Sequence, residues 1–178
     1  IYCINGATVT VSNSVFDRNW ADTNGGAVYS YGCTMSYTNC TFTYNRTNRG
    51  DGGAFHLVYS PTTFTKCEFI GSSTNGGDGG AFYISSTDVT MDHCVFAYDS
   101  ASYQYPAGSY NGGAIFFHGT SDGVFENCTF YKCYARGLGG TLYLHAAANP
   151  VFKNCIISDS QQGSAIHIYY SQNAAFEY

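Results

Sequence analysis

Residues 79–96 read Gly-Gly-Ala-Phe-Tyr-Ile-Ser-Ser-Thr-Asp-Val-Thr-Met-Asp-His-Cys-Val-Phe, and related stretches recur along the whole chain. Each of the first five copies opens with a Gly-Gly pair followed by Ala or Thr and an apolar residue, and a Cys with an aromatic or apolar residue two places later closes it. A period of 20 to 50 residues indicates a solenoid, propeller or array, because one repeat cannot bury its own apolar side. The copies are 27, 27, 33, 27 and 24 residues apart and begin at Gly25, Gly52, Gly79, Gly112, Gly139 and a degenerate Gly163.

Apolar residues alternate with polar ones inside each copy, as at Phe82 and Ile84 or at Ile115 and Phe117. This two-residue period predicts β-strands. Glycine clusters and β-branched residues interrupt every candidate helix, and a propeller blade needs about 40 residues or more. The sequence therefore predicts an all-β fold, a parallel β-helix of about six coils with roughly 27 residues and about three short strands in each.

The composition of the chain fits one such domain over residues 1–178. Of the 178 residues, 44% are apolar and only 11% are charged, which is enough apolar material for a long, narrow core. The net charge of -5 argues against a nucleic-acid partner, because phosphate contacts need a basic surface. The chain contains no apolar run of 18 residues and no leader of a charged then apolar type, so we expect no membrane-spanning segment.

Both ends of the sequence fall inside a repeat. Residues 1–3 align with 115–117, and residues 176–178 align with 125–127. An open β-helix end exposes unpaired backbone and core, so we expect either a segment of a longer protein or subunits that stack end to end.

Stacking in register turns each repeat position into a column of side chains along the helix axis. One such column consists of cysteines, for which we favour a role as small buried fillers without partners. Neighbouring strands lie about 4.8 Å apart, so disulfides between adjacent coils are the alternative; a line of thiols does not offer the tetrahedral cluster that a metal requires. The column contains Cys40, Cys67, Cys94, Cys128 and Cys155, with Ser14 in the same place ahead of them. Cys3 and Cys33 lie in adjacent coils near a turn and are a candidate disulfide.

A second column, which points outward between two inward apolar positions, consists only of rings. Aromatic residues suit sheet surfaces and stack on their neighbours, but a continuous exposed aromatic face usually marks an interaction site. We expect this column to form a contact surface, together with a tyrosine-rich segment that lengthens the fourth coil by six residues. The column contains Tyr2, Tyr29, His56, Tyr83, Phe116, Tyr143 and His167, and the segment contributes Tyr98, Tyr103, Tyr105 and Tyr110.

Two polar columns are interpreted as structural. Asparagines before the cysteines suit a left-handed turn and form a ladder, and a column of Asn and Asp before the glycines suits turn formation better than calcium binding. Three Asn-x-Ser/Thr sequons are candidate glycosylation sites, of which Asn45 lies in a loop and is the best acceptor, whereas Asn39 and Asn127 belong to the asparagine ladder.

Signals for catalysis are weak. An enzyme acting on an acidic polysaccharide would need carboxylates with calcium or a basic side chain on one sheet face, whereas that face carries rings. No Ser/His/Asp arrangement, phosphate-binding loop or redox Cys-x-x-Cys is visible, so we expect no enzymatic activity, no cofactor and no metal. The arginines Arg18, Arg46, Arg49 and Arg136 are scattered in loops.

Two short elements carry a resemblance to a known family: Gly-Gly-Ala-Val at 25–28 and Gly-Gly-Ala-Ile at 112–115, and Phe-x-x-Asn at 16–19 and 42–45. This pattern resembles the repeats of chlamydial polymorphic outer-membrane proteins over essentially the whole chain. The resemblance implies a right-handed parallel β-helix of the pectin-lyase-like type that is extracellular or exposed on a cell surface and is typically adhesive.

Three functions are therefore considered. The first is a non-enzymatic extracellular structural or adhesive protein, for instance a filament subunit that associates end to end or laterally or binds a cell-surface protein or glycan. The second is a carbohydrate-binding β-helix that uses its aromatic face. The third is a polysaccharide lyase or hydrolase.

Overall fold

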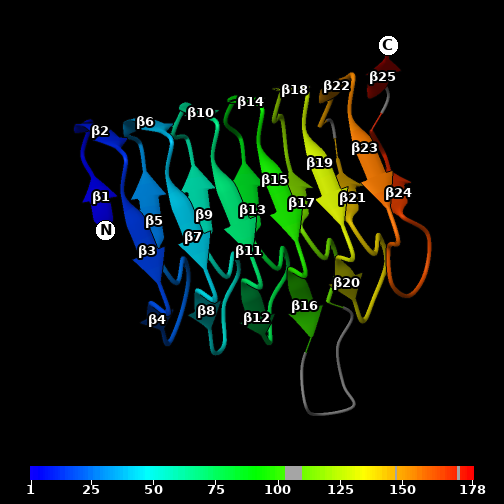
Figure 1. Cartoon of the computed structure of the whole chain (residues 1–178), viewed down its shortest axis with the longest axis horizontal. Helices are drawn as coiled ribbons and strands as arrows, with labels where there is room; N and C mark the ends of the chain where they lie inside the picture. Colours follow the sequence, from blue (N-terminus) through cyan, green and yellow to red (C-terminus); the bar gives the residue numbers. More distant parts are fainter. Residues whose placement is uncertain (103–109, 147, 172) are drawn as a thin grey trace.

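The computed structural model describes residues 1–102, 110–146, 148–171 and 173–178, and in these residues the chain winds into a parallel β-solenoid without helices. The coils follow one another along a single axis in sequence order (Figure 1). No membrane-spanning helix occurs in the described residues. The predicted parallel β-helix of about six coils is confirmed, although a full coil has four strands and not about three.

The first two sheets meet at one corner of the coil and provide the longer strands. The first sheet contains β1 (Tyr2–Ile4), β5 (Val28–Tyr31), β9 (Phe55–Val58), β13 (Phe82–Ser85), β17 (Ile115–His118), β21 (Leu142–His145) and β24 (Ile166–Tyr169). The second sheet contains β2 (Thr8–Ser12), β6 (Thr34–Thr38), β10 (Thr62–Thr65), β14 (Val89–Asp92), β18 (Gly123–Glu126), β22 (Val151–Lys153) and β25 (Ala175–Glu177).

The other two sheets have strands of only two or three residues. The third sheet contains β3 (Val15–Asp17), β7 (Thr41–Thr43), β11 (Glu68–Ile70), β15 (Val95–Ala97), β19 (Thr129–Tyr131) and β23 (Ile156–Ser158). The fourth sheet contains β4 (Trp20–Ala21), β8 (Arg46–Thr47), β12 (Ser73–Asn75), β16 (Ser100–Ser102) and β20 (Tyr134–Ala135).

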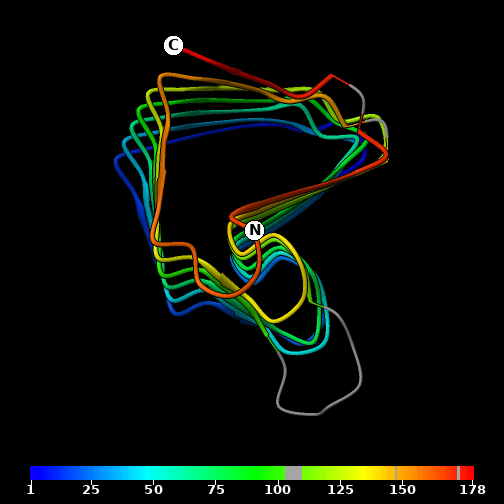
Figure 2. The ribbon, with the colours of Figure 1, turned by 90° about the vertical axis from the view of Figure 1, so that its right-hand side faces the viewer.

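Every strand pairs in parallel with the equivalent strand one coil away. Tyr83, for example, pairs with His56 on one side and with Phe116 on the other. The coils superpose closely when the molecule is viewed along its axis (Figure 2). The six additional residues of the fourth coil fall between β16 and β17, and the register is the same on both sides of them.

The corner between the second and third sheets depends on one residue per coil with a left-handed backbone. Its φ lies between 49° and 54° in all six coils, a region that asparagine tolerates better than most residues. The predicted asparagine ladder forms here, because the Asn39 side-chain amide donates to that of Asn13 at 2.8 Å and Asn154 donates to Asn127 at 2.6 Å. The corner residues are Asn13, Asn39, Lys66, His93, Asn127 and Asn154.

The Gly-Gly pairs lead into the first sheet, and each glycine has its own reason to be there. Gly52 has a φ of 65°, which a residue with a Cβ adopts only at a cost. A Cβ at Gly53 would overlap the Gly80 carbonyl oxygen and the backbone of Ser73. The first glycine therefore makes the turn, and the second allows adjacent coils to approach closely.

The core contains ladders of stacked rings, of which the longest lies behind the third sheet. Its successive ring centroids are 4.7, 5.2, 4.7 and 4.7 Å apart, from Phe16 through Phe42, Phe69 and Phe96 to Phe130. All of these rings except Phe16 are fully buried. Burial of each phenylalanine contributes roughly 1.5–3 kcal/mol to folding, so this ladder is a principal source of stability.

The Asn of the Phe-x-x-Asn element points into the interior. The Asn45 side-chain carbonyl accepts hydrogen bonds from the Asn19 backbone amide at 3.0 Å and from its side chain at 2.9 Å, and the Asn45 side chain donates to the Phe16 carbonyl. Asp99 takes this place in the fourth coil, where one carboxylate oxygen accepts the Ser72 amide at 2.8 Å and the other has no partner among the described residues. Burial raises the pKa of Asp99 well above its usual range.

Candidate functional site

The predicted ring column forms a continuous stack on the outer face of the first sheet; we call it the outer ladder. Ring centroids of successive members are 5.1, 5.3, 4.8, 5.5, 5.0 and 5.1 Å apart, with interplanar angles of 17° or less. In-register parallel pairing places these rings at the coil spacing, so every ring except the two end members, Tyr2 and His167, lies between two others. The outer ladder consists of Tyr2, Tyr29, His56, Tyr83, Phe116, Tyr143 and His167.

The outer ladder is not the open apolar face that the sequence predicts. His56, Phe116 and Tyr143 are only 7%, 6% and 7% exposed, whereas Tyr2 is 72% exposed. Turns between the fourth and first sheets bulge beside the outer face of the first sheet (Figure 2). The rings thus line a partly covered strip, with Tyr29, Tyr83 and His167 as its half-buried members.

A shorter ring stack runs beside the outer ladder and is more accessible. The His118 and His145 rings are 5.2 Å apart, and those of His145 and Tyr169 are 5.5 Å apart. The Ser85 hydroxyl lies 3.4 Å from His118 Nδ1. All four of these side chains are at least partly exposed, so this stack gives the strip an accessible polar edge.

The column of Asn and Asp before the glycines lies close to the middle of the outer ladder. Asp51 accepts the Asp78 amide at 2.8 Å, and Asp78 accepts the Asn111 amide at 2.8 Å. Burial raises the pKa of both carboxyls, to about 6 for Asp78. Burial and these two acids raise the pKa of Tyr83 to about 12. Asp51 and Asp78 therefore act as hydrogen-bond acceptors between turns, and no three His, Cys, Asp or Glu side chains of the described residues converge as a metal site.

The cysteine column lies inside the corner between the second and third sheets. Cys40, Cys67, Cys94 and Cys128 are buried and Cys155 is half-buried, and all five are free thiols. The Cys94 thiol lies 3.5 Å from the Asp92 carbonyl oxygen and 3.7 Å from that of Phe64, and burial raises the pKa of Cys40. Cys40, Cys67, Cys94 and Cys128 fill a corner of the core, whereas Cys155 also lines a surface pocket with Asn154 and Phe176.

The structure brings Cys3 and Cys33 together. Both side chains are buried, and their sulfur atoms lie 2.6 Å apart. A disulfide between these two cysteines stays a prediction.

The preference for Asn45 as the best glycosylation site is wrong for the folded chain. Asn45 is fully buried, and its side chain is engaged on both sides by the first coil. Asn39, in contrast, is exposed at its corner, and Asn127 is half-buried with its amide on Asp92. The left-handed residue before Asn45 turns its side chain inward, which the loop-like sequence does not reveal.

The tyrosine-rich segment does not present its described members on one surface. Tyr98 is exposed with its ring edge-on to Tyr131 at 5.6 Å, whereas Tyr110 is buried. Tyr103 and Tyr105 lie outside the described residues.

One site went unnoticed in the sequence. Arg18 and Arg46, which seemed scattered, lie in one pocket with Tyr44 and Trp20 at the corner between the third and fourth sheets. The signal was present in the alignment, since Arg18 and Tyr44 both precede the Asn of a Phe-x-x-Asn element, and Trp20 and Arg46 both follow it.

Comparison with known proteins supports the architecture. A family model described as right handed beta helix region matches residues 38–178, and one described as Chlamydia polymorphic membrane protein repeat matches residues 13–31. No curated protein and no solved structure gives a significant match to the chain. Because the first model spans most of the sequence, the chain belongs to the right-handed β-helix family, and its first coils carry a repeat of the Chlamydia polymorphic membrane protein type.

Proposed function

We propose that this chain is part of a non-enzymatic cell-surface protein that holds a partner along one side of its solenoid. The match to a polymorphic membrane protein repeat supports a surface location. The partner is a surface protein, a glycan or a second copy of the chain, and the contact is adhesive or structural.

The observation that carries the proposal is the continuity of the outer ladder. Its rings run from the first coil to the last without a break, and each is stacked on its neighbours. Rings that are already ordered lose little entropy on binding, and aromatic side chains often dominate the energy of an interface. The half-exposed edge made by Tyr83, His118 and His145 is the accessible part of this strip.

The test is a double variant, Tyr83→Ser with Tyr143→Ser. We expect the coil to stay folded while adhesion to cells and lateral self-association weaken at least tenfold, because two rings leave the strip. Circular dichroism and a denaturation curve check the fold; cell-binding and sedimentation assays check the function.

The matched control is Thr63→Ala with Thr90→Ala, which changes two exposed residues on the outer face of the second sheet. The proposal predicts that this variant associates as the native chain does. If the tyrosine variant, still folded, adheres and associates normally, the outer ladder is not a contact surface.

Carbohydrate binding is the second candidate function for the same strip. It is favoured by the polar groups beside the rings, namely the Ser85 hydroxyl and the imidazole of His118 at 3.4 Å. A saturable change in tyrosine fluorescence with a defined neutral oligosaccharide supports it, and release of shorter sugar products would instead indicate an enzyme.

A further inference from the structure

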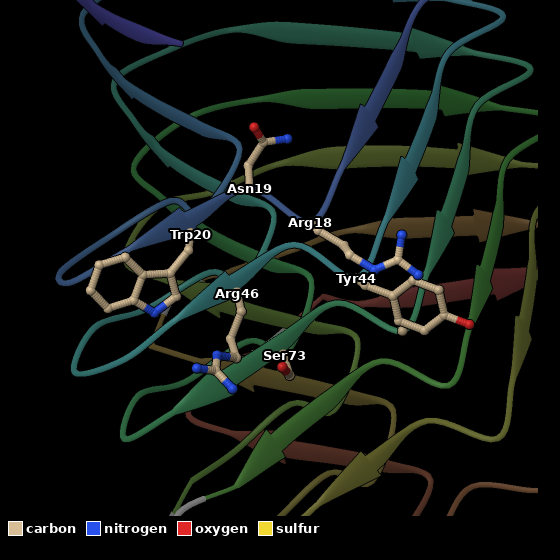
Figure 3. A pocket seen from close by; sticks show the side chains of 7 residues that line it. Arg18, Asn19, Trp20, Tyr44, Arg46 and Ser73 are labelled. Atoms are coloured by element: carbon tan, nitrogen blue, oxygen red, sulfur yellow. The ribbon is translucent and has the colours of Figure 1, made fainter.

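A cleft of about 530 Å³ lies across the first three coils at the corner between the third and fourth sheets (Figure 3). It lies on another side of the coil from the outer ladder, which belongs to the first sheet. Its lining contains two arginines and no acid, although the whole chain has a net charge of -5. The lining residues are Arg18, Asn19, Trp20, Tyr44, Arg46, Gly71 and Ser73.

One side of the cleft is a stack made by Arg18 and Tyr44. The Arg18 guanidinium lies over the Tyr44 ring, 5.4 Å from its centroid. Gly71 makes room for that ring, because a Cβ there would lie 2.7 Å from it. Arg18 also pairs with Asp17 at 2.6 Å, so cation–π attraction and an ion pair hold its guanidinium in place.

The other side presents Arg46 between Trp20 and Ser73. These three residues are register partners on adjacent strands β4, β8 and β12, so their side chains leave the same face of the fourth sheet. The Arg46 side chain is exposed and has no hydrogen bond or ion pair within the described residues. The Trp20 indole is 57% exposed, which makes it a large flat apolar surface beside an unneutralised cation.

We propose that this cleft binds a saccharide ring that bears a carboxylate or sulfate group. The planar guanidinium of Arg46 pairs with the oxyanion through two parallel hydrogen bonds. The indole of Trp20 packs on the apolar face of the ring, and the side chains of Ser73 and Asn19 bond its hydroxyls.

An acidic sugar suits this combination because it has a flat apolar face, hydroxyls and a fixed anion on one ring. The cleft is open toward solvent and crosses several coils, so a sugar chain can continue past the bound ring. Arg18 already forms an ion pair with the Asp17 carboxylate, so Arg46 is the cation of the cleft that can bind the ligand.

The chain itself provides the probe, since Trp20 is its only tryptophan. We expect tryptophan fluorescence to change in a saturable way with dextran sulfate or carboxymethyl dextran and not with unmodified dextran. These three polymers share a backbone, so they separate sulfate, carboxylate and neutral sugar. The apparent affinity falls with added salt, because the oxyanion contact is only partly buried.

Arg46→Gln should weaken the binding of the charged polymer about tenfold, whereas Arg49→Gln should leave it within about twofold. Arg49 is an exposed arginine of the same coil outside the cleft, and both changes remove one charge. Equal losses in the two variants would mean unspecific attraction and overturn the proposal. An equal response to unmodified dextran, or tighter binding of a phosphorylated peptide than of either charged dextran, would also overturn it.

This result is independent of the outer ladder. The Tyr83→Ser and Tyr143→Ser variant should keep its Trp20 response to charged dextran, and Arg46→Gln should keep its adhesion along the outer ladder. Failure of one site is therefore distinguishable from failure of the other.

Discussion

The ring stack in the core and the outer ladder have nearly the same geometry and very different chemistry. Ring centroids from Phe42 to Phe69 and from Phe69 to Phe96 are 5.2 and 4.7 Å apart, and those from His56 to Tyr83 are 4.8 Å apart. The coil spacing imposes these distances in both places. Stacking by itself is thus a property of the fold. What distinguishes the outer ladder is that six of its seven members are tyrosine or histidine, which carry polar atoms, and that Asp51 and Asp78 lie near Tyr83.

The largest difference should appear when one ring is removed from each stack. Phe69→Ala is expected to lower the free energy of unfolding by about 3–5 kcal/mol, because it leaves a cavity among fully buried rings. Tyr83→Ser should cost about 1 kcal/mol, since it mainly removes contacts with two neighbouring rings. Urea denaturation of both variants measures the contrast, and equal losses would show that the outer ladder is as much a part of the core as the inner stack.

The second contrast concerns acid. Burial lowers the pKa of His56 from 6.5 to about 4, so the folded state holds its proton less tightly than the unfolded state does. Above pH 6.5 the buried imidazole does not lower the free energy of unfolding, because it is neutral in both states. As the pH falls toward 4, the free energy of unfolding decreases by about 2–3 kcal/mol. His56→Phe should therefore unfold less readily than the native chain at pH 4 and show a flatter stability profile between pH 4 and 6.5. A profile unchanged by the substitution would contradict burial of this imidazole.

The third and smallest contrast has the opposite sign. The pKa of Asp78 is raised to about 6, so the folded state holds this proton more tightly than the unfolded state does. The contribution of Asp78 to the free energy of unfolding therefore falls as the pH rises from 3.8 to 6. Asp78→Asn should raise the free energy of unfolding by about 1–2 kcal/mol at pH 7 and leave it almost unchanged at pH 3. Asn24 and Asn111 already occupy this column, so the amide fits the same hydrogen bonds. Thermal unfolding at the two pH values is the measurement, and a loss of stability at pH 7 would indicate that the Asp78 charge is needed.

The repeat period was sufficient to predict the fold and the membership of each column. It predicted about three strands per coil because two-residue strands such as β4 and β8 are too short to show alternation. Which way a side chain points after a left-handed corner is not encoded in the period, and the prediction for Asn45 was wrong for that reason.

The sites were harder to predict than the columns. Alignment placed His56 and Phe116 on an outward position, but whether turns cover that position depends on the path of the loops. Arg18 and Arg46 belong to different columns, one at the corner and one on β8, so examination of each column alone could not bring them together. The bend between the third and fourth sheets brings Arg18 and Arg46 into the same cleft.

The hydrogen bonds of all four sheets run parallel to the solenoid axis, and this gives the molecule a mechanical character. A force that pulls the first and last coils apart acts on the few backbone hydrogen bonds that join one terminal coil to the next. These hydrogen bonds can break one after another. The force that such a rod withstands is then that of a single coil, however many coils it contains. A covalent link between Cys3 and Cys33 would join β1 to the chain just beyond β5, where separation of the first coil from the second would begin.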